Sequence, residues 1–71
     1  MHEPEDRLER AERHVREGEG RLARQMALVT RLARRGSDPA IAEDVLERLR
    51  TTLELARDHL RREREARGRR A

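Results

Sequence analysis

Apolar and small residues recur along this chain at alternating spacings of three and four positions, from Leu8 to Leu60. Such spacing gathers them on one face of an α-helix and leaves charged residues on the others. The pattern breaks once, near Gly36, and so predicts one helix over about residues 4–35 and a second over about 39–66. The predicted interface residues along the two stripes are Val15, Leu22, Met26, Val29, Leu32, Val45, Leu46, Leu49, Leu53, Ala56 and Leu60.

Both stripes are wider near the break than near the chain ends, since Leu28, Ala33 and Ile41 flank them there. We therefore expect a well-packed end at the turn and frayed helices at the other end. Gly18 and Gly20 lower the helix propensity of the first half by about 1 kcal/mol each. These two glycines predict a kink or a local break in the first helix; the alternative is that Gly18 allows a close backbone approach to Ala56 on the facing helix.

The break has the chemistry of a tight connection between helices, with the turn over residues 36–38. Gly36 can take the left-handed conformation that ends a helix. Ser37 follows it, Asp38 is a good N-cap, and Pro39 is tolerated at the first position of a helix because its missing N–H would be unpaired there. Gly36, Ser37, Asp38 and Pro39 are therefore the predicted turn and capping residues.

Charge alternates in blocks along the chain. Residues 1–20 carry a net charge of −3, residues 21–36 +5, residues 37–56 −3 and residues 57–71 +4. Antiparallel helices would set opposite signs side by side, whereas parallel helices would oppose like signs. The predicted fold class is thus all-α, an antiparallel two-helix hairpin over residues 1–66 in which the numbers of facing residues sum to about 74 or 75. Residues 67–71 are expected to form a disordered, Arg-rich tail.

A hairpin of this size buries only one stripe on each helix, which is seldom enough for stability. Packing two hairpins face to face would complete a four-helix bundle or coiled-coil assembly. We therefore expect a homo-oligomer, with a dimer favoured, and regard a different partner protein on the same face as the alternative.

Composition narrows the function classes. Charged residues make up 46% of the chain, and there is no aromatic residue and no Cys, so a disulfide framework is excluded. No apolar run approaches the roughly 18 residues of a membrane span, and the acidic N-terminus does not resemble a signal peptide. We expect a cytoplasmic protein with no membrane partner.

Catalytic chemistry has few candidates. His14 and His59 would lie at about the same level of the hairpin and are weak candidates for a metal site, because two His without a third ligand are too few for zinc. Ser37, Thr30, Thr51 and Thr52 have no His nearby to activate them. We expect no enzyme activity, no catalytic residue, no metal and no cofactor.

The high isoelectric point, about 11.1, and the Arg-rich tail raise nucleic-acid binding as an alternative. Against it, the net charge is only +3, acids alternate with the tail arginines, and no aromatic side chain can stack on bases. We rank it below self-association. A regulator whose hairpin caps the helices of another protein is a further alternative.

The stretch from Ala11 to Arg64 resembles short, mostly uncharacterised helical-hairpin proteins of alphaproteobacteria. The resemblance is carried by the run from Ala11 to Glu19, by Ala23-Arg24-Gln25, by the Gly36-Ser37-Asp38 turn and by the Leu-rich second half. Gly20 and the lack of an aromatic residue in the second helix depart from that pattern. The resemblance implies a helical hairpin and no established activity.

Overall fold

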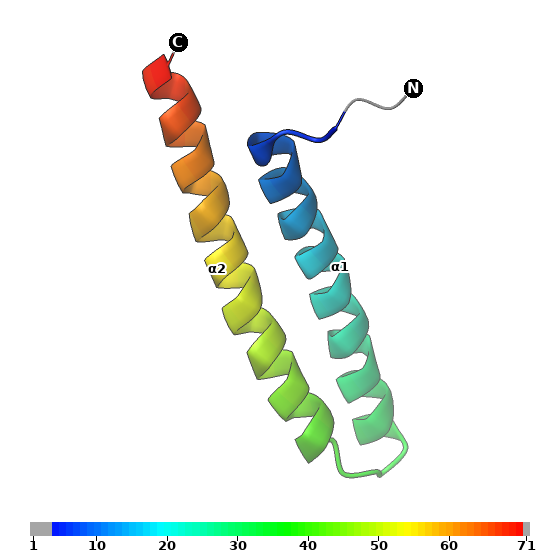
Figure 1. The fold of residues 1–71 in the computed structure, drawn as a ribbon. Coiled ribbons are helices and arrows are strands. Elements are labelled where there is room, and N and C mark those ends of the chain that lie inside the picture. Colours follow the sequence, from blue (N-terminus) through cyan, green and yellow to red (C-terminus); the bar gives the residue numbers. More distant parts are fainter. Residues whose placement is uncertain (1–3, 71) are drawn as a thin grey trace.

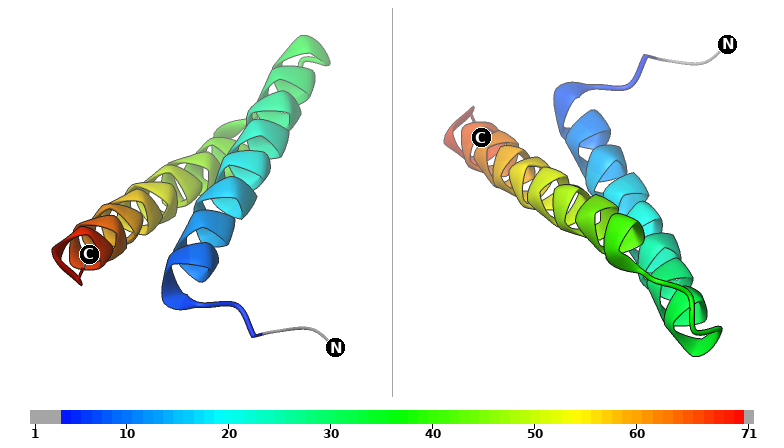
Figure 2. Two further views of the ribbon diagram at one scale, coloured as in Figure 1. Left: turned by 90° about the horizontal axis from the view of Figure 1, so that it is seen from above. Right: turned by 90° about the horizontal axis from the view of Figure 1, so that it is seen from below.

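The protein is described by a computed structural model, which covers residues 4–70. Helix α1 spans Arg7–Arg34 and helix α2 spans Ala40–Arg70, 28 and 31 residues long. The two helices run antiparallel and pack against each other, so that the start of α1 and the end of α2 lie at one end of the hairpin and the turn at the other (Figure 1). Seen along their length, the helices cross at an angle and do not lie strictly parallel (Figure 2). The predicted pair of packed helices is confirmed.

Helix α1 begins three residues later than predicted, because the chain before it is used for capping. The Asp6 side chain accepts a hydrogen bond from the Glu9 backbone N–H at 2.7 Å and so occupies the N-cap position. Glu5, one residue earlier, contacts the Arg13 guanidinium at 2.9 Å. Helix α1 then runs without a break through Gly18 and Gly20.

The turn closes through backbone hydrogen bonds. Gly36 has φ +74°, the left-handed conformation. Its N–H donates to the Ala33 carbonyl at 3.1 Å, and the Ser37 N–H donates to the Leu32 carbonyl at 2.9 Å. These two bonds form a Schellman motif, which satisfies the carbonyls at the end of α1. The Asp38 side chain accepts from the Ala40 N–H at 3.0 Å at the start of α2.

The core is a narrow row of five buried side chains between the helices, namely Ala11, Ala42, Leu46, Leu53 and Leu60. Leu53 lies over Gly18: a β-carbon on Gly18 would lie 3.1 Å from Leu53 Cδ1. The glycine therefore does allow a close approach, but to Leu53 rather than to Ala56. The numbers of this pair sum to 71, about one helical turn from the predicted register, because the leucine fills the space that the glycine leaves.

The C-terminal part of α2 corrects a second expectation. The helix continues through Arg70, so the prediction of a disordered tail over 67–71 is wrong for residues 67–70. Arg67 connects this segment to the start of α1, with its guanidinium lying 3.0 Å from Asp6 Oδ2. Ala71 lies outside the described residues.

Candidate interaction face

The eleven predicted interface residues divide into two groups. Leu46, Leu53 and Leu60 are buried within the hairpin itself. The others are half-buried or exposed, and Met26 (47% exposed) and Val45 are exposed most. The half-buried ones are Val15, Leu22, Val29, Leu32, Leu49 and Ala56. The hairpin thus uses only the centre of the predicted stripe and leaves its margins to solvent.

Two large apolar side chains outside the predicted set are the most exposed. Ile41 is 82% exposed and Leu55 is 65% exposed. Ile41 precedes Val45 and Leu49 at four-residue spacing, so that sequence spacing alone could have placed it on their face. Leu55 is two positions from Leu53, which turns it away from α1, and its isolated position gives no such signal.

One side of the hairpin carries a groove beside Gly18. The groove has a volume of about 180 Å³. Gly18, Leu53 and Ala56 form part of its lining, together with His14, Glu17, Arg21, Leu49 and Thr52. The groove thus combines an apolar part from α2 with a charged rim from α1.

The same side remains apolar from the groove to the turn. Val45 and Ile41 lie one and two helical turns from Leu49, toward the turn. On α1, Leu28 lies two turns beyond Arg21, again toward the turn. We call the surface made by Leu28, Ile41, Val45, Leu49, Thr52 and Ala56 the groove face.

The other side of the hairpin is apolar on α1 alone. Val15, Leu22 and Met26 are exposed or half-buried there. An ion pair joins the two helices along this side, with Arg57 Nη2 lying 3.6 Å from Glu19 Oε2. This opposite face is therefore bordered by charge on α2, whereas the groove face is apolar on both helices near the turn.

Charges are paired differently at the two ends. At the open end Arg13 lies between two carboxylates, 2.9 Å from Glu5 and 2.8 Å from Glu17. The hydrogen bonds from Arg13 hold the pKa of both carboxyls below the ordinary value, and the two carboxylates raise the pKa of Arg13. The pKa of Asp6 is also lowered, first by the backbone N–H of Glu9 and then by Arg67.

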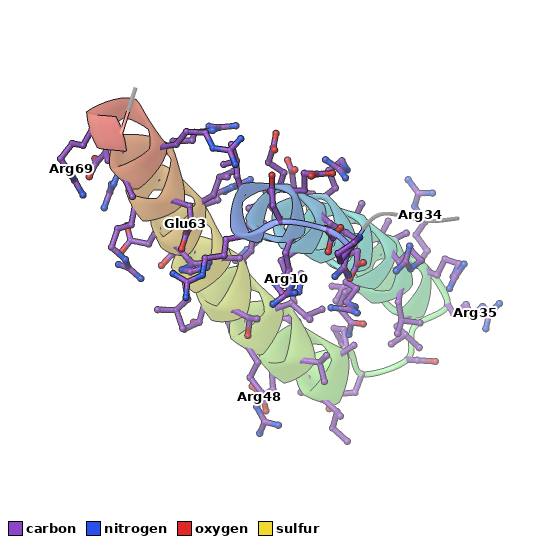
Figure 3. The ribbon with its side chains drawn as sticks, turned by 45° about the horizontal axis from the view of Figure 1, so that its top comes forward. Arg10, Arg34, Arg35, Arg48, Glu63 and Arg69 are labelled. Carbon is purple, nitrogen blue, oxygen red and sulfur yellow. The ribbon has the colours of Figure 1, made fainter. Side chains whose placement is uncertain are left out.

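The turn end has no such network. Within residues 4–70, the ion pairs that join the two helices are Asp6 with Arg67 and Glu19 with Arg57, both outside the turn half. Arg34 and Arg35 extend away from the turn, and Arg48 extends from α2 away from α1 (Figure 3). The basic second half of α1 and the acidic first half of α2 thus lie side by side without an ion pair between them in the described part of the chain.

His14 and His59, the two weak metal-site candidates, lie in separate depressions. His14 lines the groove, whereas His59 lies in a separate shallow depression with Arg7, Arg10 and Glu63. His59 Nε2 lies 3.8 Å from Glu63 Oε1, one helical turn away. Among residues 4–70, no group of three His, Cys, Asp or Glu side chains is placed to hold a metal ion.

The helix hydroxyls are engaged with the backbone. Thr30, Thr51 and Thr52 each donate to the carbonyl four residues earlier, at 2.9 to 3.2 Å. Thr side chains on helices often make this hydrogen bond. Each hydroxyl therefore makes a local structural bond to its own helix.

The comparisons with known proteins found no relative of this chain. No family model, no curated protein and no solved structure matches the chain. The resemblance to alphaproteobacterial helical-hairpin proteins thus stays a prediction. In the described residues, neither helix has an apolar stretch that could cross a membrane.

Proposed function

We propose that this chain is a small, non-catalytic, cytoplasmic interaction protein that acts by self-association through an apolar face of its hairpin. The observation that supports the proposal is the surplus of apolar side chains near the turn. Ile41 and Val45 are exposed there, although the hairpin buries only five side chains in its own core. Burying an exposed isoleucine or valine side chain contributes about 1.5–3 kcal/mol, so covering this surface would favour association.

Light scattering coupled to size-exclusion chromatography tests the proposal directly. The detector has to be refractive index or peptide-bond absorbance, because the chain has no Trp, Tyr or Phe. We expect about twice the chain mass of 8.4 kDa, and a helical circular dichroism signal that melts at higher temperature as the concentration rises. A fully helical monomer whose melting does not depend on concentration would contradict the proposal.

Nucleic-acid binding is the second candidate, because the turn half presents exposed arginines. Arg24, Arg31, Arg34 and Arg35 are all exposed, and no ion pair is found for them within residues 4–70. Such a cluster could bind phosphates without reading sequence. Fluorescence anisotropy with a labelled duplex would show binding that weakens steeply with salt if this alternative holds, and no binding at about 50 mM salt if it does not.

A regulator that caps the helices of another protein is the third candidate. It would leave the purified chain monomeric and only partly helical, because the apolar face would stay uncovered without that partner. The same light-scattering and circular dichroism measurements therefore separate this candidate from self-association.

A further inference from the structure

We infer that two copies of this chain pair groove face to groove face about a two-fold axis parallel to the helices, with both turns at the same end. The inference rests on the self-association proposed above and specifies its surface and its geometry. In this arrangement α2 of each copy lies beside α1 of the other copy, in antiparallel orientation.

The choice of face comes from exposure. Ile41 and Val45 are exposed on the groove face, and Leu28 and Leu49 continue that face on α1 and α2. The opposite face offers Met26 as its single large exposed apolar residue within residues 4–70. That face is also crossed by the ion pair between Glu19 and Arg57, which a partner would have to desolvate. The groove face is therefore the surface whose covering removes more apolar area from water.

The relative direction of the two copies comes from where that apolar surface lies. Ile41, Val45 and Leu28 are all in the turn half of the hairpin, whereas the groove rim toward the open end carries His14 and Glu17. With both turns at one end, apolar surface meets apolar surface. If the copies were reversed, Ile41 would face the charged rim of the partner and its burial would leave polar groups unpaired.

Charge is also complementary in this arrangement. At the open end Glu5, Asp6 and Glu17 already have partners in their own chain. In the turn half, residues 21–36 carry +5 and residues 37–56 carry −3, and no ion pair joins the two blocks within the described hairpin. Placing α2 of one copy beside α1 of the other at the turn end brings each block next to the opposite charge of the partner. The charges that lack a partner within the hairpin thus gain one between copies.

Pulsed electron paramagnetic resonance on a spin-labelled full-length chain tests the direction. Because the chain has no Cys, Ser37→Cys gives one label at the exposed turn and leaves its backbone hydrogen bond to Leu32 possible. Neighbouring helices of a bundle lie about 8–10 Å apart, so we expect a label separation near 20 Å or less. Mixing with excess unlabelled chain should abolish this signal, which shows that the distance is between copies.

A label separation approaching 54 Å, the longest dimension of the hairpin, would overturn the parallel arrangement. In that case light scattering would still show a dimer, so the proposed function would survive while this inference failed. A helical monomer would instead contradict the proposed function itself. The two failures are therefore distinguishable.

Three matched substitutions to Asp test the face. Ile41→Asp should weaken dimerisation by at least about tenfold, since a charge would be buried in the interface. The hairpin itself should stay helical, because Asp is favourable in the first turn of a helix, near its positive end. Leu55→Asp is the control, an exposed leucine outside the groove face, and should leave the dimer unchanged.

Met26→Asp examines the opposite face in the same assay. It should change the dissociation constant by less than about threefold if the groove face is the interface. A large loss of dimerisation in Met26→Asp with no loss in Ile41→Asp would overturn the choice of face. Circular dichroism of each variant at a concentration where the chain is monomeric reports whether its hairpin is intact.

Discussion

The turn end and the open end of this hairpin are held together by different kinds of contact. At the turn end the backbone closes on itself through Gly36 and Ser37, and the Gln25 side-chain amide donates to the Ala42 carbonyl at 2.9 Å. At the open end small and large apolar residues alternate, with Ala11 1% exposed and Leu60 also buried, and the ion pair of Asp6 with Arg67 lies beyond them. Buried apolar side chains are thus present at the open end as they are at the turn end.

This difference changes the meaning of the wide apolar stripe near the turn. A wide stripe suggests deep packing, yet Ile41 and Met26 at that end are among the most exposed apolar residues of the described chain. Two helices can bury only the strip where they touch, so additional apolar residues to either side remain on the surface. Width of the stripe therefore measures the apolar surface left over for a partner rather than the packing within the hairpin.

The largest change in stability is expected when one apolar side chain is truncated at each end of the hairpin. Leu60→Ala should lower the free energy of unfolding by about 2–5 kcal/mol, because it leaves a cavity at a buried position. Ile41→Ala should change it by less than about 0.5 kcal/mol when the chain is monomeric, as for other exposed positions. Urea unfolding followed by circular dichroism at 222 nm measures both.

One result would contradict the expected difference between Leu60→Ala and Ile41→Ala. If Leu60→Ala were neutral while Ile41→Ala destabilised the monomer, the open end would be frayed and the turn end well packed, as the stripe width alone suggests. Leu55→Ala serves as a control for Leu60→Ala, because it makes the same substitution in α2 at a leucine that is exposed.

Local features of the fold could be predicted from the sequence, because they depend on neighbours in the chain. Gly36 and Asp38 mark the turn by their own conformational and capping preferences, and the three-and-four spacing marks both helices. The charge blocks, being averages over many residues, were enough to predict the antiparallel direction. None of these features needed knowledge of a distant contact.

Features that depend on distant contacts could not be predicted in the same way. Arg67, in the last turns of α2, contacts Asp6, 61 residues earlier in the chain. The register depends on which side chain fills the space over Gly18, and Leu53 fills it rather than Ala56. The candidate face depends on how the two helices cross, because this decides which margin of the stripe stays in solvent.

A smaller effect is expected from the two N-caps, one at each end. Asp38→Ala removes the side-chain acceptor for Ala40 and should cost about 1 kcal/mol of unfolding free energy. Asp6→Ala removes the acceptor for Glu9 and also the partner of Arg67, and should cost about as much. Asp6→Asn is the informative variant, because Asn is as good a cap but cannot form the ion pair.

Thermal melts of the three cap variants separate the contributions. If Asp6→Asn melts like the unaltered chain, the ion pair with Arg67 adds nothing measurable, as is common for exposed pairs. Hydrogen exchange at residues 65–70 then shows whether the last turn of α2 needs this contact. Unchanged protection in Asp6→Asn would mean that the helix reaches Arg70 on its own propensity.

The smallest expected effect is the response of the open end to acid. Arg13 lowers the pKa of Glu5 and Glu17 from the ordinary 4.5, and the Glu9 N–H with Arg67 lowers the pKa of Asp6 from 3.8. A carboxyl whose pKa is lower in the folded state stabilises the fold above its unfolded pKa, and this stabilisation is lost as the pH falls through the folded value. The open end should therefore keep its ion pairs at pH values below the ordinary pKa of 4.5 for Glu and 3.8 for Asp, and lose them as the pH falls through the lowered values.

Carboxyl carbon-13 shifts followed through an acid titration measure these groups one by one. We expect the midpoints of Glu5 and Glu17 to rise toward 4.5 in Arg13→Ala, because the guanidinium that lowers both is gone. Asp6 should keep its lowered midpoint in the same variant, since the groups that lower it are the Glu9 N–H and Arg67. A rise at Asp6 as large as that at Glu5 would mean that the whole open end had come apart, and that Arg13 holds the N-terminal segment in place rather than two separate carboxylates.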